Sequence, residues 1–194
     1  FKDSLIVGVQ FDLFKNDSRV IQEKIGLNSG NQQSIKGKSI LQMLGSGFTL
    51  FHQGKGIPVV IGQFDFNKHI DLRKKKYLNS FQSHLNVALN QGAVHVNDIH
   101  MAVNTGIGMA DIRAITFEDG TPFLENGRLW YTLSIRGRAL PHHIQGVFSL
   151  NPSVFDLKLE GIIVFDREDG LLRNEIASHL FFDRNEKLWR GLTT

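Results

Sequence analysis

The sequence has 194 residues, of which 41% are hydrophobic and 21% charged, so it is large and apolar enough to bury a core and lacks the bias of a disordered or fibrous protein. Its formal net charge of +3 is small, and the basic run Arg73-Lys74-Lys75-Lys76 is more typical of a solvated turn or helix end than of a nucleic-acid-binding face, which needs a broad basic surface with interleaved aromatics. The absence of cysteine excludes disulfides and thiolate metal sites, and no apolar run has the length of a membrane-spanning helix.

The first third of the chain predicts strands separated by glycine-rich turns. Fifteen Phe and nineteen Gly, against four Pro, are typical of a sheet-rich fold. An apolar run followed by alternation over residues 3–14 predicts one or two strands, and residues 19–25 predict another. Residues 32–62 contain two or three apolar segments at hairpin spacing, although one turn of helix over 39–44 fits the pattern as well.

The middle of the chain predicts a helix followed by a strand. Apolar residues over 73–90 recur at the spacing of an amphipathic helix, which Gly92 ends. Residues 93–103 then predict a strand that the pair Asn97-Asp98 interrupts.

Residues 110–137 predict a hairpin that begins at an acidic residue, Asp111. An apolar strand over 112–117 is followed by polar turns, of which Asn126-Gly127 is a strong hairpin signal because both residues tolerate positive φ. The strand over 128–135 comes next. Its side chains alternate, with Leu129, Tyr131, Leu133 and Ile135 on one face and Arg128, Trp130, Thr132 and Ser134 on the other.

A hairpin of the same design returns near the end of the chain. Glu175 precedes an apolar strand over 176–182, and after a polar turn a Trp-containing strand runs over 188–193. Strands over 144–150 and 159–165 are expected between the two hairpins. Repeated hairpins in an all-β chain indicate the blades of a β-propeller more strongly than they indicate other all-β architectures.

The acids at the two hairpin starts suggest a chemistry. In a propeller, the first strands of successive blades converge on a central channel, so carboxyl groups far apart in sequence can face one pocket. Glycoside hydrolysis needs such a pair, because one carboxyl group protonates the leaving oxygen while another activates water or attacks carbon. Asp111 and Glu175 hold equivalent places in the two hairpins.

Three short motifs give the chain a family resemblance. An Asp before a short apolar strand, a D-G turn and an aromatic second strand occur here as Asp111-Ile112-Arg113, Asp119-Gly120 and Trp130-Tyr131. In this the chain resembles the five-bladed β-propeller glycoside hydrolases, the broad group that includes families 43, 32 and 130. The resemblance covers roughly residues 95–194, with the best-matched blades at about 95–140 and 141–194.

The resemblance implies three carboxyl groups: a general base from the first blade, an Asp that orients the acid, and a Glu as the acid. Asp111 matches the orienting residue. Glu160, in Leu159-Glu160-Gly161, and Glu175, in Glu175-Ile176-Ala177, both compete for the acid, and Glu175 is preferred because the hairpin after it is the better copy. Neither motif carries the proline of the family. Asp3 and Asp98 are the candidates for the base, but Asp98 lies too close to Asp111 in sequence to open a different blade.

Further side chains are candidates for binding a sugar, and each has a simpler explanation. Aromatic rings stack on the apolar faces of sugars, and Arg pairs with acidic sugars. Packing in the sheet, solvated strand edges and capped turns account for the same residue types. The candidates are Asp98, His100, Arg113, Trp130 and His179.

Taken together, the sequence predicts a single all-β domain over 1–194, propeller-like and either part of a longer protein or a smaller sheet fold that imitates the pattern, with a β-sandwich as the alternative fold. The resemblance implies a carbohydrate substrate, no nucleic acid and a secreted or periplasmic location, and no cofactor or metal at the site apart from a structural cation in the channel. The rival functions are a non-catalytic carbohydrate-binding β domain and a repeat domain for protein contacts. The sequence contains no P-loop, dinucleotide fingerprint or G-x-S-x-G elbow, which lowers the odds of nucleotide or serine-hydrolase chemistry.

Overall fold

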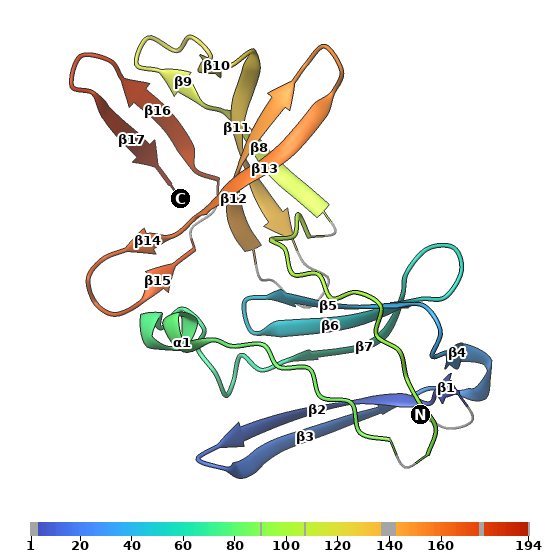
Figure 1. Cartoon of the computed structure of the whole chain (residues 1–194). Coiled ribbons are helices and arrows are strands. Elements are labelled where there is room, and N and C mark those ends of the chain that lie inside the picture. Colours follow the sequence, from blue (N-terminus) through green and yellow to red (C-terminus); the bar gives the residue numbers. More distant parts are fainter. Residues whose placement is uncertain (1–3, 90, 107, 137–142, 175–176, 194) are drawn as a thin grey trace.

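The computed structural model describes residues 4–89, 91–106, 108–136, 143–174 and 177–193. The chain is all-β, as predicted, and its strands form two groups that an extended segment connects (Figure 1). None of the sheets in the described part of the chain closes on itself. No helix in that part is both long and apolar enough to cross a membrane.

The N-terminal group consists of a hairpin and a three-stranded antiparallel sheet, with a short two-stranded ladder beside them. Its strands are β1 (Leu5–Ile6), β2 (Gly8–Lys15), β3 (Ser18–Gly26), β4 (Gln33–Ser34), β5 (Lys38–Leu44), β6 (Gly47–Gln53) and β7 (Val59–Asp65), with the short 3-10 turn η1 (Ser29–Asn31) between β3 and β4. The predicted strands of this region are confirmed. Residues 39–44 lie in β5, so the helical alternative for them is wrong.

The C-terminal group contains the main sheet and a hairpin that packs beside it. Its strands are β8 (Gly108–Ala114), β9 (Thr116–Phe117), β10 (Leu124–Glu125), β11 (Arg128–Arg136), β12 (His143–Asn151), β13 (Asp156–Ile163), β14 (Phe165–Asp166), β15 (Leu172–Arg173), β16 (His179–Asp183) and β17 (Leu188–Leu192). The second predicted hairpin is confirmed, because β16 pairs with β17. The strand predicted over 112–117 is divided in the structure between β8, which contains Asp111 and pairs with β11, and β9, which pairs in parallel with β16.

The predicted helix is much shorter in the structure, and the predicted strand after it is absent. Helix α1 spans only Lys75–Ser80, and residues 81–89 and 91–106 form an extended segment without regular structure. Isolated helices need an apolar face packed against a partner, and almost every side chain from Arg73 to Leu89 is exposed. The strand over 93–103 fails for the same kind of reason, since a strand needs a neighbour to accept its backbone hydrogen bonds.

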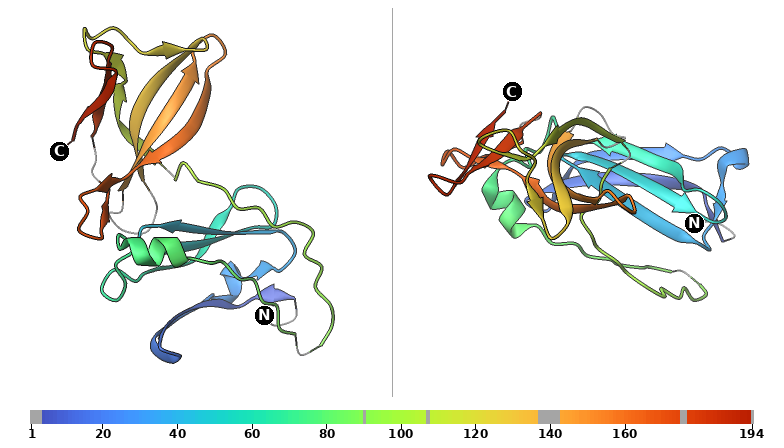
Figure 2. Two further views of the ribbon diagram at one scale, coloured as in Figure 1. Left: turned by 60° about the vertical axis from the view of Figure 1, so that its left-hand side comes forward. Right: turned by 90° about the horizontal axis from the view of Figure 1, so that it is seen from above.

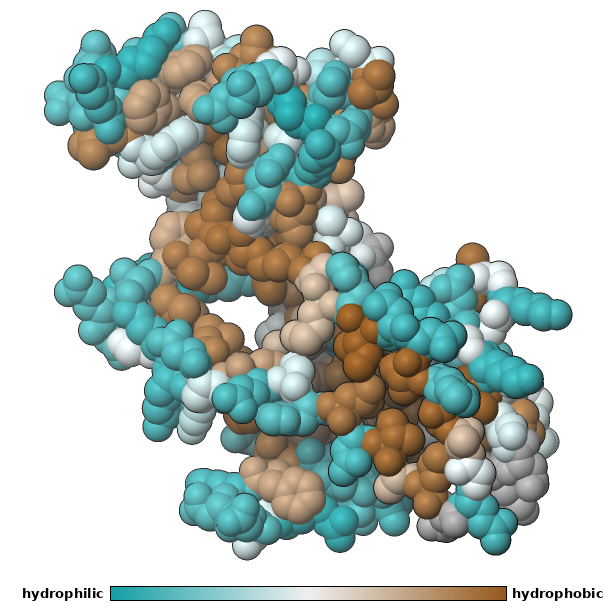
Figure 3. All heavy atoms as spheres, viewed as in Figure 1, coloured by the Kyte–Doolittle hydropathy of each residue, from teal (hydrophilic) through white to brown (hydrophobic). Residues whose placement is uncertain are grey.

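The extended segment leaves apolar side chains on the surface. Figure 3 shows brown, apolar atoms gathered on the face that this segment crosses. Its exposed apolar residues include Leu85, Val94, Val96, Ile99 and Met101.

The main sheet orders its strands β10-β11-β12-β13, and β8 pairs with β11 on the same side as β10. Every pairing in it is antiparallel. Leu133, Ile135 and Phe148 form its buried apolar core, against which Tyr131, Ile144 and Leu159 pack. Burying a side chain of this size contributes about 1.5–3 kcal/mol.

The other face of the same two strands is polar and is also buried. Thr132, Ser134, Gln145 and Ser149 are each fully buried there. The alternation predicted for β11 is therefore correct. Its polar face, however, is covered by protein, because Ser178 and Asn174 hydrogen-bond to it.

The two groups of strands meet at α1. The hairpin β14–β15 approaches this helix in both views of Figure 2, and a β-bridge joins Lys74 to Leu171. The amide of Leu172 also donates to the carbonyl of Arg73 at 2.6 Å, and Lys75 forms an ion pair with Asp166.

Candidate functional site

The covered polar face of β11 and β12 is centred on Gln145. The backbone amide of Gln145 donates to Asn174 Oδ1 at 3.0 Å, and the side-chain Oε1 of Gln145 accepts from the backbone amide of Ser178 at 3.4 Å. Ser134 Oγ donates to the same oxygen at 3.5 Å, and Thr132 Oγ1 donates to the carbonyl of Ser178. We call these five residues, Thr132, Ser134, Gln145, Asn174 and Ser178, the polar cluster.

This face also contains buried polar atoms that lack a hydrogen-bond partner. Gln145 Nε2, His143 Nδ1 and Trp130 Nε1 are all buried without a hydrogen-bond partner among the described residues. Buried polar groups are nearly always hydrogen-bonded, since an unmade bond costs about 1–3 kcal/mol. Three such atoms lie on this one face of the main sheet.

Asp111 lies on β8, the strand that pairs with β11 opposite β12. It belongs to a β-bulge in β8, where Ala110 pairs with Ser134 and Arg113 pairs with Thr132, so two residues oppose Leu133. Its φ of 54° lies in the left-handed region, which costs a non-glycine residue about 1–3 kcal/mol and is often found at functional sites. The bulge and the unusual backbone set the direction of the carboxyl group.

The carboxylate of Asp111 faces a cation. Arg136 Nη2 lies 3.6 Å from Asp111 Oδ2, and both side chains are partly exposed. Pairs of this kind contribute only about 0–1 kcal/mol to stability, so the pair has little value as a structural tie. Arg136 also pairs in register with His143, which brings Asp111, Arg136 and His143 to the same end of the sheet.

Glu160 lies elsewhere. It is on β13, at the opposite edge of the sheet from β8, so three strand spacings, roughly 14 Å, separate the two backbones. The carboxyl groups of a glycosidase pair lie about 5–9.5 Å apart, so these two side chains would have to reach towards each other across β11 and β12.

A structural network holds Glu160 in place. Ser149 Oγ donates to Glu160, and Arg128 Nε donates to Ser149 Oγ at 2.7 Å. Arg128 Nη1 also donates to Asp156 Oδ2 at 2.8 Å, and this hydrogen bond lowers the pKa of Asp156. Glu160 thus belongs to a chain of contacts that fastens β11, β12 and β13 together.

Two other sequence candidates, Glu175 and Asp3, lie outside the described residues. The residues near Glu175 are described, and both bond to Gln145: Asn174 through its side chain and Ser178 through its amide. The chain on either side of Glu175 is therefore tied to the polar cluster.

Trp130 and His179 take part in packing. The rings of Trp130 and Phe123 meet edge to face with centroids 6.2 Å apart, and His179 Nε2 lies 3.5 Å from Thr116 Oγ1. Phe123 also contacts Trp189 at 5.2 Å, so an aromatic cluster joins the two hairpins. Sheet packing, the simpler explanation for Trp130, accounts for these contacts.

Of the remaining candidates, only Arg113 lies near the polar cluster, since it pairs in register with Thr132. Asp98 and His100 lie exposed on the extended segment, and Arg113 is exposed on β8. Within the described ranges, no three His, Asp or Glu side chains gather closely enough to hold a metal ion.

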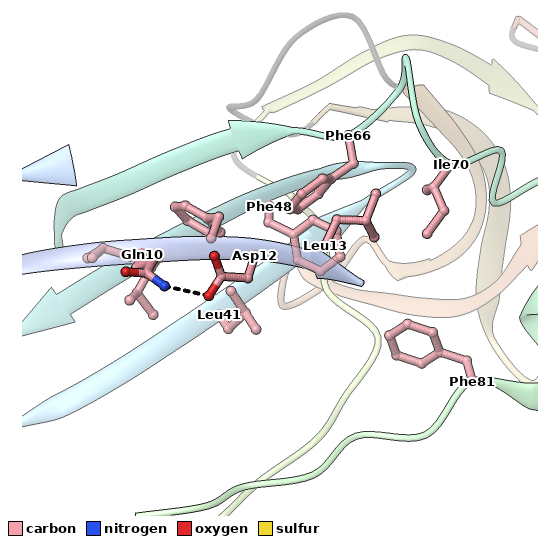
Figure 4. A pocket seen from close by; sticks show the side chains of 11 residues that line it. Gln10, Asp12, Leu13, Leu41, Phe48, Phe66, Ile70 and Phe81 are labelled. Atoms are coloured by element: carbon pink, nitrogen blue, oxygen red, sulfur yellow. Dashed lines mark hydrogen bonds between the residues drawn. The ribbon is translucent and has the colours of Figure 1, made fainter. Parts of the chain in front are cut away.

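A cavity that the sequence did not reveal lies in the N-terminal group. It has a volume of about 530 Å³ and lies between β2 and the sheet of β5 and β6, with Phe66, Ile70 and Phe81 at one end (Figure 4). Its lining is apolar except for Gln10 and Asp12, whose side chains hydrogen-bond to each other. Such a lining lacks the paired acids and donors of a catalytic site, so the polar end of the main sheet is the stronger candidate.

No protein-family model, curated protein or solved structure shows significant similarity to this chain.

Proposed function

We propose that the chain forms blades of a five-bladed β-propeller glycoside hydrolase, with Glu175 as the general acid and Asp111 as the residue that orients it. The observation that carries this proposal is that Ala110, the neighbour of Asp111, pairs with Ser134, which also pairs with Gln145, the residue that binds Asn174 and Ser178. Carboxyl groups that act on one glycosidic bond must lie close together, and the contacts of Gln145 favour Glu175 over Glu160 for that role.

The main sheet supports the propeller part of the proposal. Strands β8, β11, β12 and β13 are four neighbouring antiparallel strands, which is the composition of a propeller blade. Asp111 lies within β8, three residues after its start, and not before the strand as the sequence predicted. The hairpin β16–β17 lies beside this sheet, and its strand β16 pairs in parallel with β9.

The proposed reaction divides three tasks between carboxyl groups. Glu175 donates a proton to the oxygen of the leaving sugar while a base activates water or attacks the anomeric carbon. Asp111, held by the positive charge of Arg136, orients the acid. Asp3 and Asp98 remain the predicted candidates for the base.

Substituting the two competing glutamates tests the proposal. We expect Glu175→Gln to lower the turnover of aryl glycosides and oligosaccharides by about 10²- to 10⁴-fold, because amide nitrogen cannot supply the proton. Glu160→Gln should keep most of the activity, and Glu186→Gln, in the exposed turn between β16 and β17, is a matched control. Loss of activity in Glu160→Gln alone would make Glu160 the acid, and a parent inactive on the whole panel would reject the enzyme.

A carbohydrate-binding β domain without catalysis is the second candidate, and Trp189 favours it. This residue on β17 is 54% exposed, and its ring contacts Phe182 at 5.1 Å and Phe123 at 5.2 Å. An exposed ring on an aromatic base suits the apolar face of a sugar. Calorimetric binding of oligosaccharides that Trp189→Ala abolishes and Glu175→Gln leaves intact, together with an inactive parent, would establish this alternative.

A further inference from the structure

The cavity in the N-terminal group is lined by one carboxyl group whose hydrogen bonding is incomplete. Asp12 Oδ2 accepts a hydrogen bond from Gln10 Nε2, whereas Asp12 Oδ1 is buried and has no hydrogen-bond partner among the described residues. No lysine, arginine or histidine in the described part of the chain lines the cavity, so the lining supplies no cation to balance the carboxylate. The unpaired oxygen is therefore a site for a positively charged hydrogen-bond donor.

The rest of the lining is apolar, and it surrounds a space of the size that small molecules occupy. Apart from Gln10 and Asp12, every lining residue is aliphatic or a phenylalanine, and Figure 4 shows the Asp12 side chain among them. The volume of about 530 Å³ falls within the range of about 300–1,000 Å³ that is typical of ligand sites. The phenylalanines attract cations to their ring faces as well as apolar groups. They are Phe11, Phe48, Phe66 and Phe81.

Fold stability does not explain an aspartate at this position. Asp12 lies on β2 and pairs in register with Gln22 of β3, but this pairing gives Asp12 Oδ1 no donor. Aspartate is disfavoured in strands, and a buried oxygen without a partner lowers stability further. A residue that conflicts with both its strand and its apolar surroundings is typical of a binding site.

We propose that this cavity binds a primary or secondary amine with an apolar body, whose protonated nitrogen donates a hydrogen bond to Asp12 Oδ1. The ammonium group supplies both the missing donor and the missing positive charge, while the apolar body contacts the phenylalanines and leucines of the lining. Alkylamines are protonated at pH 7, as the lysine side chain is. The proposal does not depend on the glycoside hydrolase, because the cavity lies in the other group of strands from Asp111.

Three probes with the same alkyl chain and different head groups test the proposal: n-octylamine, 1-octanol and octanoate. Calorimetry at pH 7 measures their affinities, and amide chemical shifts locate them. We expect n-octylamine to bind about 10- to 100-fold more tightly than 1-octanol, because its hydrogen bond to a carboxylate is charge-assisted. Octanoate, which Asp12 repels, should not bind. n-Hexylamine, which is two methylene groups shorter, should bind about tenfold more weakly than n-octylamine.

Two substitutions with matched controls locate the site. Asp12→Asn keeps the shape of the side chain and should lower the affinity for n-octylamine by about 10- to 100-fold, with that for 1-octanol nearly unchanged. Asp17→Asn, in the exposed turn between β2 and β3, makes the same change of charge and should bind n-octylamine as the parent does. Phe81→Ala should weaken the binding of both probes, and Phe14→Ala, at an exposed position outside the lining, should weaken neither.

A preference for n-octylamine over 1-octanol that Asp12→Asn removes and Asp17→Asn keeps supports the proposal. Equal affinities for the three probes, equal losses in both aspartate variants, or no binding of n-octylamine overturns it. If Asp12→Asn fails to fold, as circular dichroism would show, the parent decides. Amide shifts that n-octylamine alone causes in β2, β5 and β6 then support the proposal, and shifts confined to other strands overturn it. Neither result affects the proposed function, which the activity of Glu175→Gln tests.

Discussion

The two faces of strands β11 and β12 are both buried and yet differ in kind. One face carries Leu133, Ile135 and Phe148, and the other carries Ser134, Gln145 and Ser149. Burial of the first face removes apolar surface from water, which is the main favourable contribution to folding. Burial of the second contributes much less, because each hydrogen bond only replaces one with water.

The comparison shows that burial alone does not indicate what a residue does. The apolar face holds the sheet together, whereas the polar face binds Asn174 and Ser178 through hydrogen bonds. It also leaves Gln145 Nε2 without a partner among the described residues. Substitutions on the apolar face should therefore change stability most. Substitutions on the polar face should change stability less and function more.

The largest expected effect is that of Phe148→Ala. Phe148 is fully buried in the apolar core, and its removal leaves a cavity that the neighbouring side chains fill only in part. We expect the free energy of unfolding to fall by about 3–5 kcal/mol, measured by urea denaturation. Phe155→Ala, at a position 79% exposed in the turn before β13, is the control. Equal midpoints for the two variants would contradict the assignment of the core.

A second substitution tests how tightly that face is packed. A Cβ atom at Gly146 would lie 2.6 Å from Phe148 Cε2 and 2.9 Å from Ile135 Cδ1, so Gly146→Ala forces core side chains to move. We expect a loss of about 1–3 kcal/mol. Gly161→Ala, on β13 where no atom lies within 4 Å of the added Cβ, should cost less in the same denaturation experiment. A greater loss at Gly161 would show that the core is loose.

Much of this sheet was predictable from the sequence. Alternation located β11 and both of its faces, and the Asn126-Gly127 turn, with positive φ at both residues, located the hairpin. The burial of the polar face was missed because Thr, Ser and Gln are usually solvated. A signal was present, since residues 129–135 and 144–150 contain no charge, which is typical of strands covered on both sides.

The failed predictions share one physical cause. Residues 73–90 have the period of a helix, but a helix forms only where its apolar face meets a partner, and local sequence does not show whether one exists. The competition between Glu160 and Glu175 has the same origin. Glu160 is separated from Asp111 by the order of strands in the sheet, which spacing along the chain does not determine.

On the polar face, Thr132→Val tests the hydrogen bond to Ser178. Valine keeps the shape of threonine but leaves the carbonyl of Ser178 without the donor that holds it. We expect the free energy of unfolding to fall by about 0.5–1.5 kcal/mol, well below the effect of Phe148→Ala. Faster hydrogen exchange around Ser178 should accompany this loss. Thr49→Val, at a buried polar position on β6 in the N-terminal group, is the control and should leave that exchange unchanged. A cost as large as that of Phe148→Ala would mean that both faces contribute equally to stability.

The smallest expected effect concerns a surface link between the two hairpins. Arg184, in the turn between β16 and β17, donates to Glu118 at 3.0 Å and to Asp119 at 2.6 Å, and its guanidinium lies 4.6 Å from the centre of the Phe117 ring. Hydrogen bonds from Thr121 and then from Arg184 hold the pKa of Asp119 far below its ordinary value of 3.8. The pKa of Glu118 is lowered too, first by a backbone amide of its own and then by Arg184.

A lowered pKa in the folded state means that this link stabilises the protein above the ordinary pKa and is lost as the pH falls towards the folded value. We therefore expect Arg184→Ala to lower Tm slightly at about pH 7 and to match the parent more closely as the pH falls below about 4, where protonation of the two carboxyl groups weakens the link in the parent. Because the groups are exposed, salt should also reduce the difference. Lys55→Ala, in the exposed turn between β6 and β7, should show neither dependence. If the difference for Arg184→Ala instead stays the same in acid, the contact of Arg184 with the Phe117 ring, and not its charge pairing, accounts for the link between the two hairpins.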